Sequence, residues 1–398
     1  MANFEINNVL KYAKTNNDKL HAYLYQMLCK CDETKNYSQA SVDGIKILNR
    51  YGFHIPKKIT KAYMMTEDFK LKLALRNRSY MCLTELPVIE DPIFHLFEQT
   101  HTCAGLSGNT QLAKIVTWKA INCALNRGID KHLALHLAFA ALMIGQGNVK
   151  TAYEYAHVSS ALTKKFSDDT DTCAGVESLA CCTLSYLQSF QSMLEPLYEC
   201  HKTLKLSGGN VDGIFGTILG YFEHFMASGV QYGPLVESKL LLMEEYARNT
   251  GRPTHVTTYL LHRQFALNIR TRSDNPTEFC GKAFHEEEAL NEMNEGARKM
   301  ALRDSSSMRL QLAFVFWDKE CMVKMLERLK DYPFRDGMPA RLHTRLCFTG
   351  LSVFALGKSK GNESFWELGK NVSCWKSDSS FFSRFHSPLT LTWIPMRC

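Results

Sequence analysis

Three adjacent residues near the carboxyl end of the chain, Gly357-Lys358-Ser359, match the end of the phosphate-binding loop of many nucleotide hydrolases. The complete loop needs another glycine five positions earlier, and Ser352 stands there instead. The four residues between are Val, Phe, Ala and Leu, and such an apolar run does not curl its backbone N–H groups around phosphates. We therefore expect no nucleotide site, and we interpret residues 355–362 as the glycine turn of a last helical hairpin.

Two histidines one helical turn apart, His132 and His136, have the spacing of paired zinc ligands. A zinc protease also needs a glutamate directly after the first histidine, and this chain has Leu133 there. Two cysteine pairs lack the two-residue gap with which thiolates share a metal ion. They are Cys29 with Cys31 and Cys181 with Cys182. The sequence thus predicts no metal, no cofactor and no catalytic residue, although it leaves open a Cys–His nucleophile whose members are distant along the chain.

The composition is that of an ordinary globular protein, with 398 residues, 45% of them hydrophobic and 22% charged. The net charge of +7 is not gathered into a basic patch, so we expect no nucleic-acid partner. The longest uncharged apolar run, residues 133–145, is shorter than the roughly 20 residues that cross a bilayer, and the first residues do not resemble a signal peptide. The 14 cysteines are dispersed, as reduced core cysteines are. We expect a cytoplasmic protein without a membrane partner.

Helical hairpins would have to position any functional side chain. Residues 130–166 contain an apolar stretch, a turn at Gly145-Gln146-Gly147-Asn148, and a second stretch with apolar residues every three to four positions. The amino-terminal region predicts a similar hairpin, with Ala40, Val42, Ile45 and Leu48 on the apolar face of its second helix. Tyr37-Ser38-Gln39-Ala40 aligns with Val149-Lys150-Thr151-Ala152, which is typical of the turn and second helix of a tetratricopeptide repeat.

Further turns follow near Phe190 and Tyr232. From Val149 to Phe190 is 41 residues and from Phe190 to Tyr232 is 42, a period that suits pairs of long helices. The residues expected in repeat packing and turns are Tyr37, Ala40, Gly147, Val149, Ala152, Phe190 and Tyr232.

Five regions are expected along the chain. An extension or first helix covers residues 1–20, and a tetratricopeptide-like array covers 21–270. Residues 285–308 are acidic early and basic late, which suits the helix dipole and predicts one solvated helix. A polar helix or connector is therefore expected over 271–307. Final hairpins, with a turn near Asp318, cover 308–376. Residues 377–398 fit no helical period and are expected to form an irregular tail.

Several segments resemble one family when taken in order. They are "ILNRYGFHIP" at 47–56, the "LP" and "DP" connection at 86–92, "GNVKTAYEYA" at 147–156 and "MLEPLYE" at 193–199. Over about residues 20–375 the chain resembles the tetratricopeptide-like helical region of large multidomain AAA-type signalling ATPases and hybrid sensor kinases. The catalytic regions of that family have no counterpart here, so the resemblance implies a helical sensing or partner-binding arm and no catalytic residue.

The sequence therefore predicts an all-α protein, an α–α superhelix of about eight antiparallel hairpins. We expect a non-catalytic interaction scaffold or sensor arm in signal transduction that holds a protein or peptide on its concave face. The alternative is a truncated component or fragment of a multidomain signalling ATPase or kinase that contributes to nucleotide-dependent regulation.

Overall fold

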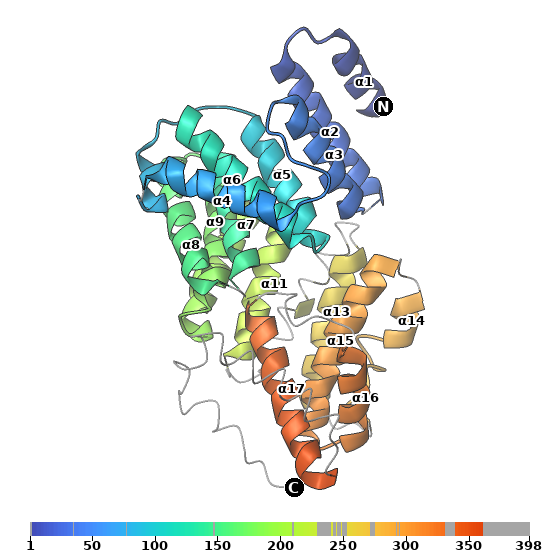
Figure 1. The fold of residues 1–398 in the computed structure, drawn as a ribbon. Coiled ribbons are helices and arrows are strands. Elements are labelled where there is room, and N and C mark those ends of the chain that lie inside the picture. Colours follow the sequence, from blue (N-terminus) through green and yellow to red (C-terminus); the bar gives the residue numbers. More distant parts are fainter. Residues whose placement is uncertain are drawn as a thin grey trace. The chain divides into compact units, whose positions relative to one another are not determined.

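The fold is all-α, as predicted (Figure 1). The computed structural model describes residues 2–34, 36–76, 78–145, 148–208, 211–228, 240–241, 244, 248, 253–270, 275–291, 293, 295–330 and 339–360. Among these residues, β-type pairing is limited to two isolated bridges. The chain divides into two compact units: unit 1 is Met1–Tyr186 with Pro196–Gly209, and unit 2 is Leu187–Glu195 with Asn210–Cys398.

Unit 1 consists of helices that pack in sequential antiparallel pairs. Alternate helices also contact each other in succession, α3 with α5, α5 with α7, and α7 with α9. The helices are α1 (Ala2–Tyr12), α2 (Asn16–Thr34), α3 (Tyr37–Arg50), α4 (Lys61–Leu75), η1 (Tyr80–Glu85), α5 (Ile93–Leu106), α6 (Thr110–Arg127), α7 (Lys131–Ile144), α8 (Val149–Thr163), α9 (Thr170–Leu184) and most of α10 (Leu194–Ser207).

Three helices of unit 1 begin with the same local structure. An asparagine at the N-cap accepts a hydrogen bond from the backbone N–H three residues later, at 3.0 to 3.2 Å, which satisfies one donor that the first turn leaves unpaired. An alanine four residues after the cap is buried against a neighbouring helix. Tyr37 and Val149 are the first residues of α3 and α8, in agreement with the aligned segments. The capping and buried residues are Asn36 and Ala40, Asn109 and Ala113, and Asn148 and Ala152.

Helix α3 buries Ala40 and Leu48 of its predicted apolar face and packs Ile45 against the core, but the prediction for Val42 is wrong. Val42 is 42% exposed, whereas Ser41 and Gly44 are buried. At Gly44, α3 comes so close to α5 that a Cβ atom would overlap the side chain of Thr100. A small residue is therefore required at this contact, and an apolar pattern alone does not reveal that requirement.

Unit 2 contains the remaining helices. Helix α15 packs on α13, α14, α16 and α17, and α11 packs on α17 and η2. Asp318 caps α16 by accepting from the backbone N–H of Cys321 at 3.0 Å, which places a turn where one was predicted. The elements are η2 (Phe190–Met193), α11 (Val211–Ala227), α13 (Pro253–Arg270), α14 (Glu286–Asn291), α15 (Glu295–Val315), α16 (Lys319–Leu329) and α17 (Pro339–Lys360).

Two local predictions in unit 2 are wrong. The segment 285–308 forms two helices rather than one, and its last residues, 304–308, are buried rather than solvated because α15 is the central helix of this unit. The turn predicted for 355–362 is wrong for residues 355–360, since α17 continues through Lys360. The irregular tail predicted for 377–398 lies outside the described residues. No helix in the described ranges is both long enough and apolar enough to cross a bilayer.

The close contact at Gly44 gives a stability prediction. Gly44→Ala should lower the free energy of unfolding by about 1–3 kcal/mol, because the new methyl group must displace Thr100 or separate α3 from α5. Urea unfolding monitored by circular dichroism measures the change. The matched control is Gly175→Ala in α9, where the nearest atom outside the helix, Leu135 Cδ1, is at an ordinary 3.5 Å. An equal loss in both variants would contradict the proposed contact.

Candidate functional site

The residues singled out in the sequence do not converge on one site. Gly357, Lys358 and Ser359 lie within α17, so the backbone there is helical and does not form a phosphate-binding loop. Phe190 is buried in η2, with its ring edge-on to His224 and His343 at centroid distances of 5.5 and 5.2 Å. The predicted turn residues Gly147 and Tyr232 lie outside the described residues.

His132 and His136 have different partners although both lie on α7. The ring of His132 hydrogen-bonds to Glu98 of α5, with Nδ1 and Oε2 3.1 Å apart. His136 is buried, and its Nε2 is 3.0 Å from the hydroxyl of Thr117. The two histidines therefore do not act as one pair of ligands.

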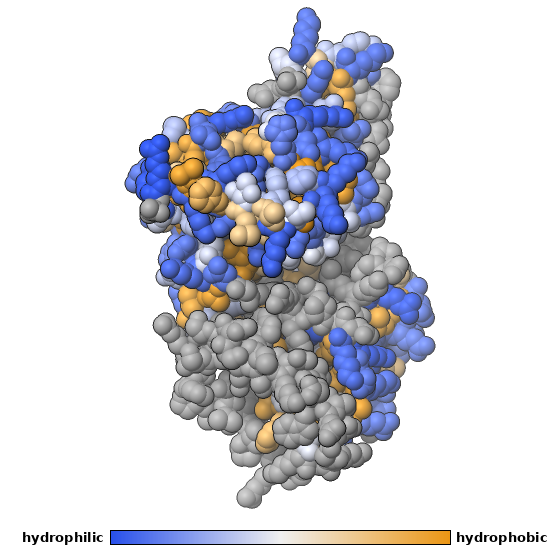
Figure 2. Space-filling model, viewed as in Figure 1, coloured by the Kyte–Doolittle hydropathy of each residue, from blue (hydrophilic) through white to orange (hydrophobic). Residues whose placement is uncertain are grey.

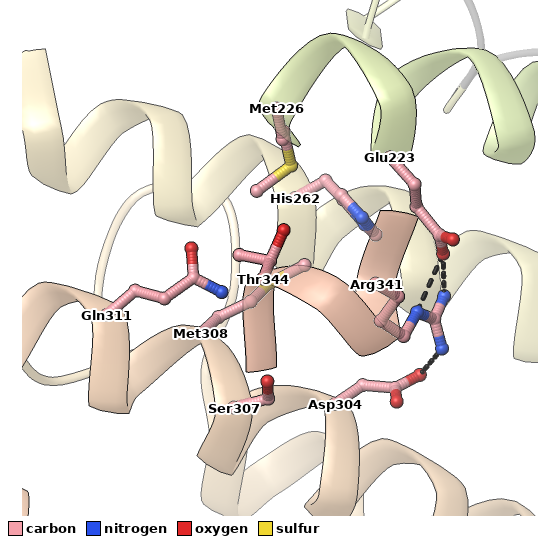
Figure 3. A pocket seen from close by; sticks show the side chains of 9 residues that line it. All are labelled: Glu223, Met226, His262, Asp304, Ser307, Met308, Gln311, Arg341 and Thr344. Atoms are coloured by element: carbon pink, nitrogen blue, oxygen red, sulfur yellow. Dashed lines mark hydrogen bonds and ion pairs between the residues drawn. The ribbon is translucent and has the colours of Figure 1, made fainter. Parts of the chain in front are cut away.

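A small cavity lies inside unit 2, between α11, α13, α15 and α17 (Figure 3). Its volume is about 30 Å³, which holds one or two water molecules but no organic substrate. The cavity is lined by Glu223, Met226, His262, Asp304, Ser307, Met308, Gln311, Arg341 and Thr344.

Arg341 joins three helices at this cavity. Its guanidinium donates two hydrogen bonds to Oε1 of Glu223 on α11, one of them at 2.7 Å, and a third at 2.5 Å to Asp304 on α15. Arg303 adds a second cation 3.1 Å from Asp304. Both carboxylates are buried, at 4% and 6% exposure, so Glu223 depends on Arg341 for its charge compensation, and Asp304 depends on Arg341 together with Arg303.

The pKa values reflect this buried network. Burial raises the pKa of Glu223, and Arg341 offsets this only in part. Burial would also raise the pKa of Asp304, but Arg341 and Arg303 together hold it below its usual value. Although burial opposes a charge on Arg341, the two carboxylates raise its pKa, so the guanidinium stays protonated.

His262 and Glu223, which both line the cavity, each have one buried side-chain atom without a hydrogen bond to the protein. Nδ1 of His262 donates to the carbonyl of Thr258 at 2.7 Å, which leaves Nε2 as an acceptor without a protein partner. Oε2 of Glu223 is likewise buried without a hydrogen bond. We therefore assign this network a structural role, the locking of α11, α15 and α17 to one another.

A different feature of unit 1 is suited to binding. Helix α4 exposes Met65, Phe69 and Leu73, with exposed fractions of 71%, 67% and 66%. Spacing of four residues places these side chains in one stripe along the helix. Figure 2 shows apolar residues among the polar surface over the part of unit 1 that α4 crosses in Figure 1. We call these three residues the α4 stripe.

The opposite side of α4 is fixed to α6. Glu67 is 1% exposed and forms ion pairs with Lys119 of α6 at 2.8 Å and with Lys70 at 2.9 Å. Burial would raise the pKa of Glu67, but these two lysines lower it overall. Leu71 and Leu75 are buried on the same side. The α4 stripe is thus presented by an anchored helix.

Basic side chains surround the α4 stripe. Lys61, Lys70, Lys72 and Arg76 are all exposed, whereas Asp68 is the only acidic residue of α4 besides the buried Glu67. Lys72 pairs with Asp68 at 2.6 Å, and the pair is open to solvent. The rim of the apolar stripe is therefore positively charged.

Removing Arg341 should be strongly destabilising. Arg341→Met leaves Glu223 buried without a cation and Asp304 with Arg303 alone, and it should cost about 3–5 kcal/mol in unfolding free energy. The triple variant Arg341→Met, Glu223→Gln, Asp304→Asn should recover much of this loss, because it removes the buried charges as well. Chemical denaturation of the single and triple variants measures both effects. Equal stability of the single variant and the wild type would contradict the locking role.

Acid should destabilise unit 2 through its buried histidines. Burial lowers the pKa of His224, His262 and His343 to about 4 each, against about 6.5 in an unfolded chain. Between these values the unfolded chain binds protons that the folded chain does not, so stability falls as the pH falls from 6.5 toward 4. His262→Gln should reduce this slope by up to about 1.4 kcal/mol per pH unit. Unfolding curves at several pH values test this, with the exposed His157 changed to Gln as the control.

Comparison with known proteins does not assign a family to this arrangement. No protein-family model, no curated protein and no solved structure matches the chain. The resemblance to the helical region of large signalling ATPases stays a prediction from the sequence.

Proposed function

We propose that the chain is a non-catalytic helical scaffold that binds a protein partner through the α4 stripe. The observation that carries this proposal is the exposure of Met65, Phe69 and Leu73 in one line on an anchored helix. Exposed apolar residues are ordinary when scattered, but a contiguous group with a polar rim is typical of interaction sites.

The packing of unit 1 supports a repeat architecture as part of this proposal. The ring of His95 stacks on that of His132, and the ring of His101 stacks on that of His136. The later residue of α5 thus contacts the later residue of α7, so the two helices run in the same direction. Alternate helices that run parallel and contact in succession are typical of α–α superhelices such as tetratricopeptide arrays. Such arrays present rigid surfaces to peptide segments.

The chemistry of the α4 stripe favours one class of occupant, an acidic amphipathic helix of another protein. Apolar residues spaced by three or four positions would contact Met65, Phe69 and Leu73, as in other helix-to-groove complexes. Acidic flanks would meet the basic rim of α4. A second copy of this chain would bring an equally basic rim to the contact, and like charges disfavour such a dimer.

A designed peptide pair tests this proposal. The first peptide is a helical 18-residue sequence with leucines on one face and glutamates on the flanks, and the second replaces each glutamate by lysine. Fluorescence anisotropy with purified protein should show binding of the acidic peptide, at least about tenfold weaker binding of the basic peptide, and weakening by added salt.

Substitutions on α4 give the direct control. Phe69→Ser combined with Leu73→Ser should abolish binding without changing the circular dichroism spectrum, because both side chains are exposed. The matched control is Leu206→Ser in α10, which removes an equally apolar side chain that is 87% exposed. Binding that survives the α4 substitutions would overturn the proposal. Cosedimentation of the protein with phosphatidylserine vesicles, lost on the same substitutions, would assign the stripe to a membrane surface instead.

A further inference from the structure

We propose that His95, Glu98 and His132 form a zinc-binding site between α5 and α7 of unit 1. This proposal is independent of the α4 stripe. The three side chains offer two imidazole nitrogens and one carboxylate oxygen that all lie within 4.8 Å of one another. Imidazole and carboxylate are among the usual protein ligands of Zn²⁺.

The separations are close to those of a zinc site. Ligand atoms about 2.0–2.1 Å from a tetrahedral zinc ion lie about 3.3 Å apart. Here Oε2 of Glu98 is 3.1 Å from Nδ1 of His132 and 3.9 Å from Nε2 of His95. Shifts of less than 1 Å would bring these two separations to that spacing.

The backbone fixes the three ligands relative to one another. His95 and Glu98 are three residues apart on α5, so they share one helix face. His132 is the second residue of α7, and its backbone N–H donates to Oδ1 of the N-cap Asp130 at 2.9 Å. Glu98 is further held by Gln99, whose side-chain amide donates to Oε1 at 3.0 Å. The two helices thus fix the backbone positions of the three residues, and Gln99 orients the carboxylate of Glu98.

One change must accompany binding. The rings of His95 and His132 are stacked, with centroids 4.0 Å apart and planes at 6°. Lone pairs in parallel planes do not point to one ion, so the two rings must turn until their nitrogens converge. Both histidines are partly exposed, at 29% and 24%, which leaves room for this rotation and for a water molecule as a further ligand.

The charge and the donor types of the cluster also suit zinc. Glu98 supplies one negative charge, and Asp130 lies beside His132 as a second buried carboxyl group. Nitrogen donors favour Zn²⁺ over Mg²⁺ and Ca²⁺, which prefer oxygen ligands.

Isothermal titration of chelator-treated protein with ZnCl₂ tests the site. We expect one zinc ion per chain in this cluster, and at least about tenfold weaker binding in His95→Gln, Glu98→Gln and His132→Gln. The titrations use a Cys280→Ser background, because the exposed Cys280 lies 3.4 Å from Nδ1 of His285 and could bind zinc on its own. His157→Gln, which removes an exposed histidine of the same unit, should leave the affinity unchanged.

Absorption spectra of bound Co²⁺ provide a second test, which uses the wild-type protein and so does not require any variant to fold. Co²⁺ in this cluster should give d–d absorption bands without a thiolate-to-cobalt charge-transfer band, since no ligand is a cysteine. A thiolate band, or the absence of any tight binding, would overturn the proposal. So would zinc affinity that is unchanged in variants of His95 and His132 whose circular dichroism shows that they are folded.

Discussion

The multi-sided packing of α7 is the constraint on which unit 1 depends. This helix contacts α5, α6, α8 and α9, and Ala134, Ala138 and Ala141 on it are fully buried. Helix axes can come close on several sides only where side chains are small. Polar residues of α7 must then find partners on the neighbouring helices. His136 finds Thr117 and His132 finds Glu98, so the two histidines are drawn to different neighbours.

The α5–α7 contact contains two stacked histidine pairs with different surroundings. His101 and His136 are buried, and burial lowers the pKa of His101 to about 3, so this pair stays neutral and serves packing. The pair at the start of the helices is partly exposed and shares the carboxylate of Glu98. The same packing geometry therefore yields a core contact at one level and a potential metal site at the other, and the difference lies in solvent access and one carboxylate.

Local patterns predicted the helices and their caps better than the contacts between them. The hairpin around residues 145–148 and the turn at Asp318 follow from glycine, asparagine and aspartate at helix ends, whose effects are local. The close approach at Gly44, the burial of residues 304–308 and the ion pairs of Arg341 depend on helices far apart in the sequence. The cluster of His95, Glu98 and His132 combines two helices in the same way, so the residue spacing within one helix does not reveal it. An asparagine four residues before an alanine, which recurs at three helix starts, was a detectable signal of those helix starts.

Helix α4 differs from α7 in how its apolar residues are used. Both helices carry apolar side chains on more than one face, although α4 carries charged residues between them. For α7 the neighbouring helices cover every face, whereas α4 has its packing partner, α6, on one side. The ion pairs of Glu67 keep α4 in that position, so it cannot rotate to bury Met65, Phe69 and Leu73. An anchored helix with an uncovered apolar stripe leaves roughly 1.5–3 kcal/mol of transfer free energy per large side chain available to a partner. Because the surrounding rim is basic, that free energy is most accessible to a partner that brings acidic residues with its apolar ones.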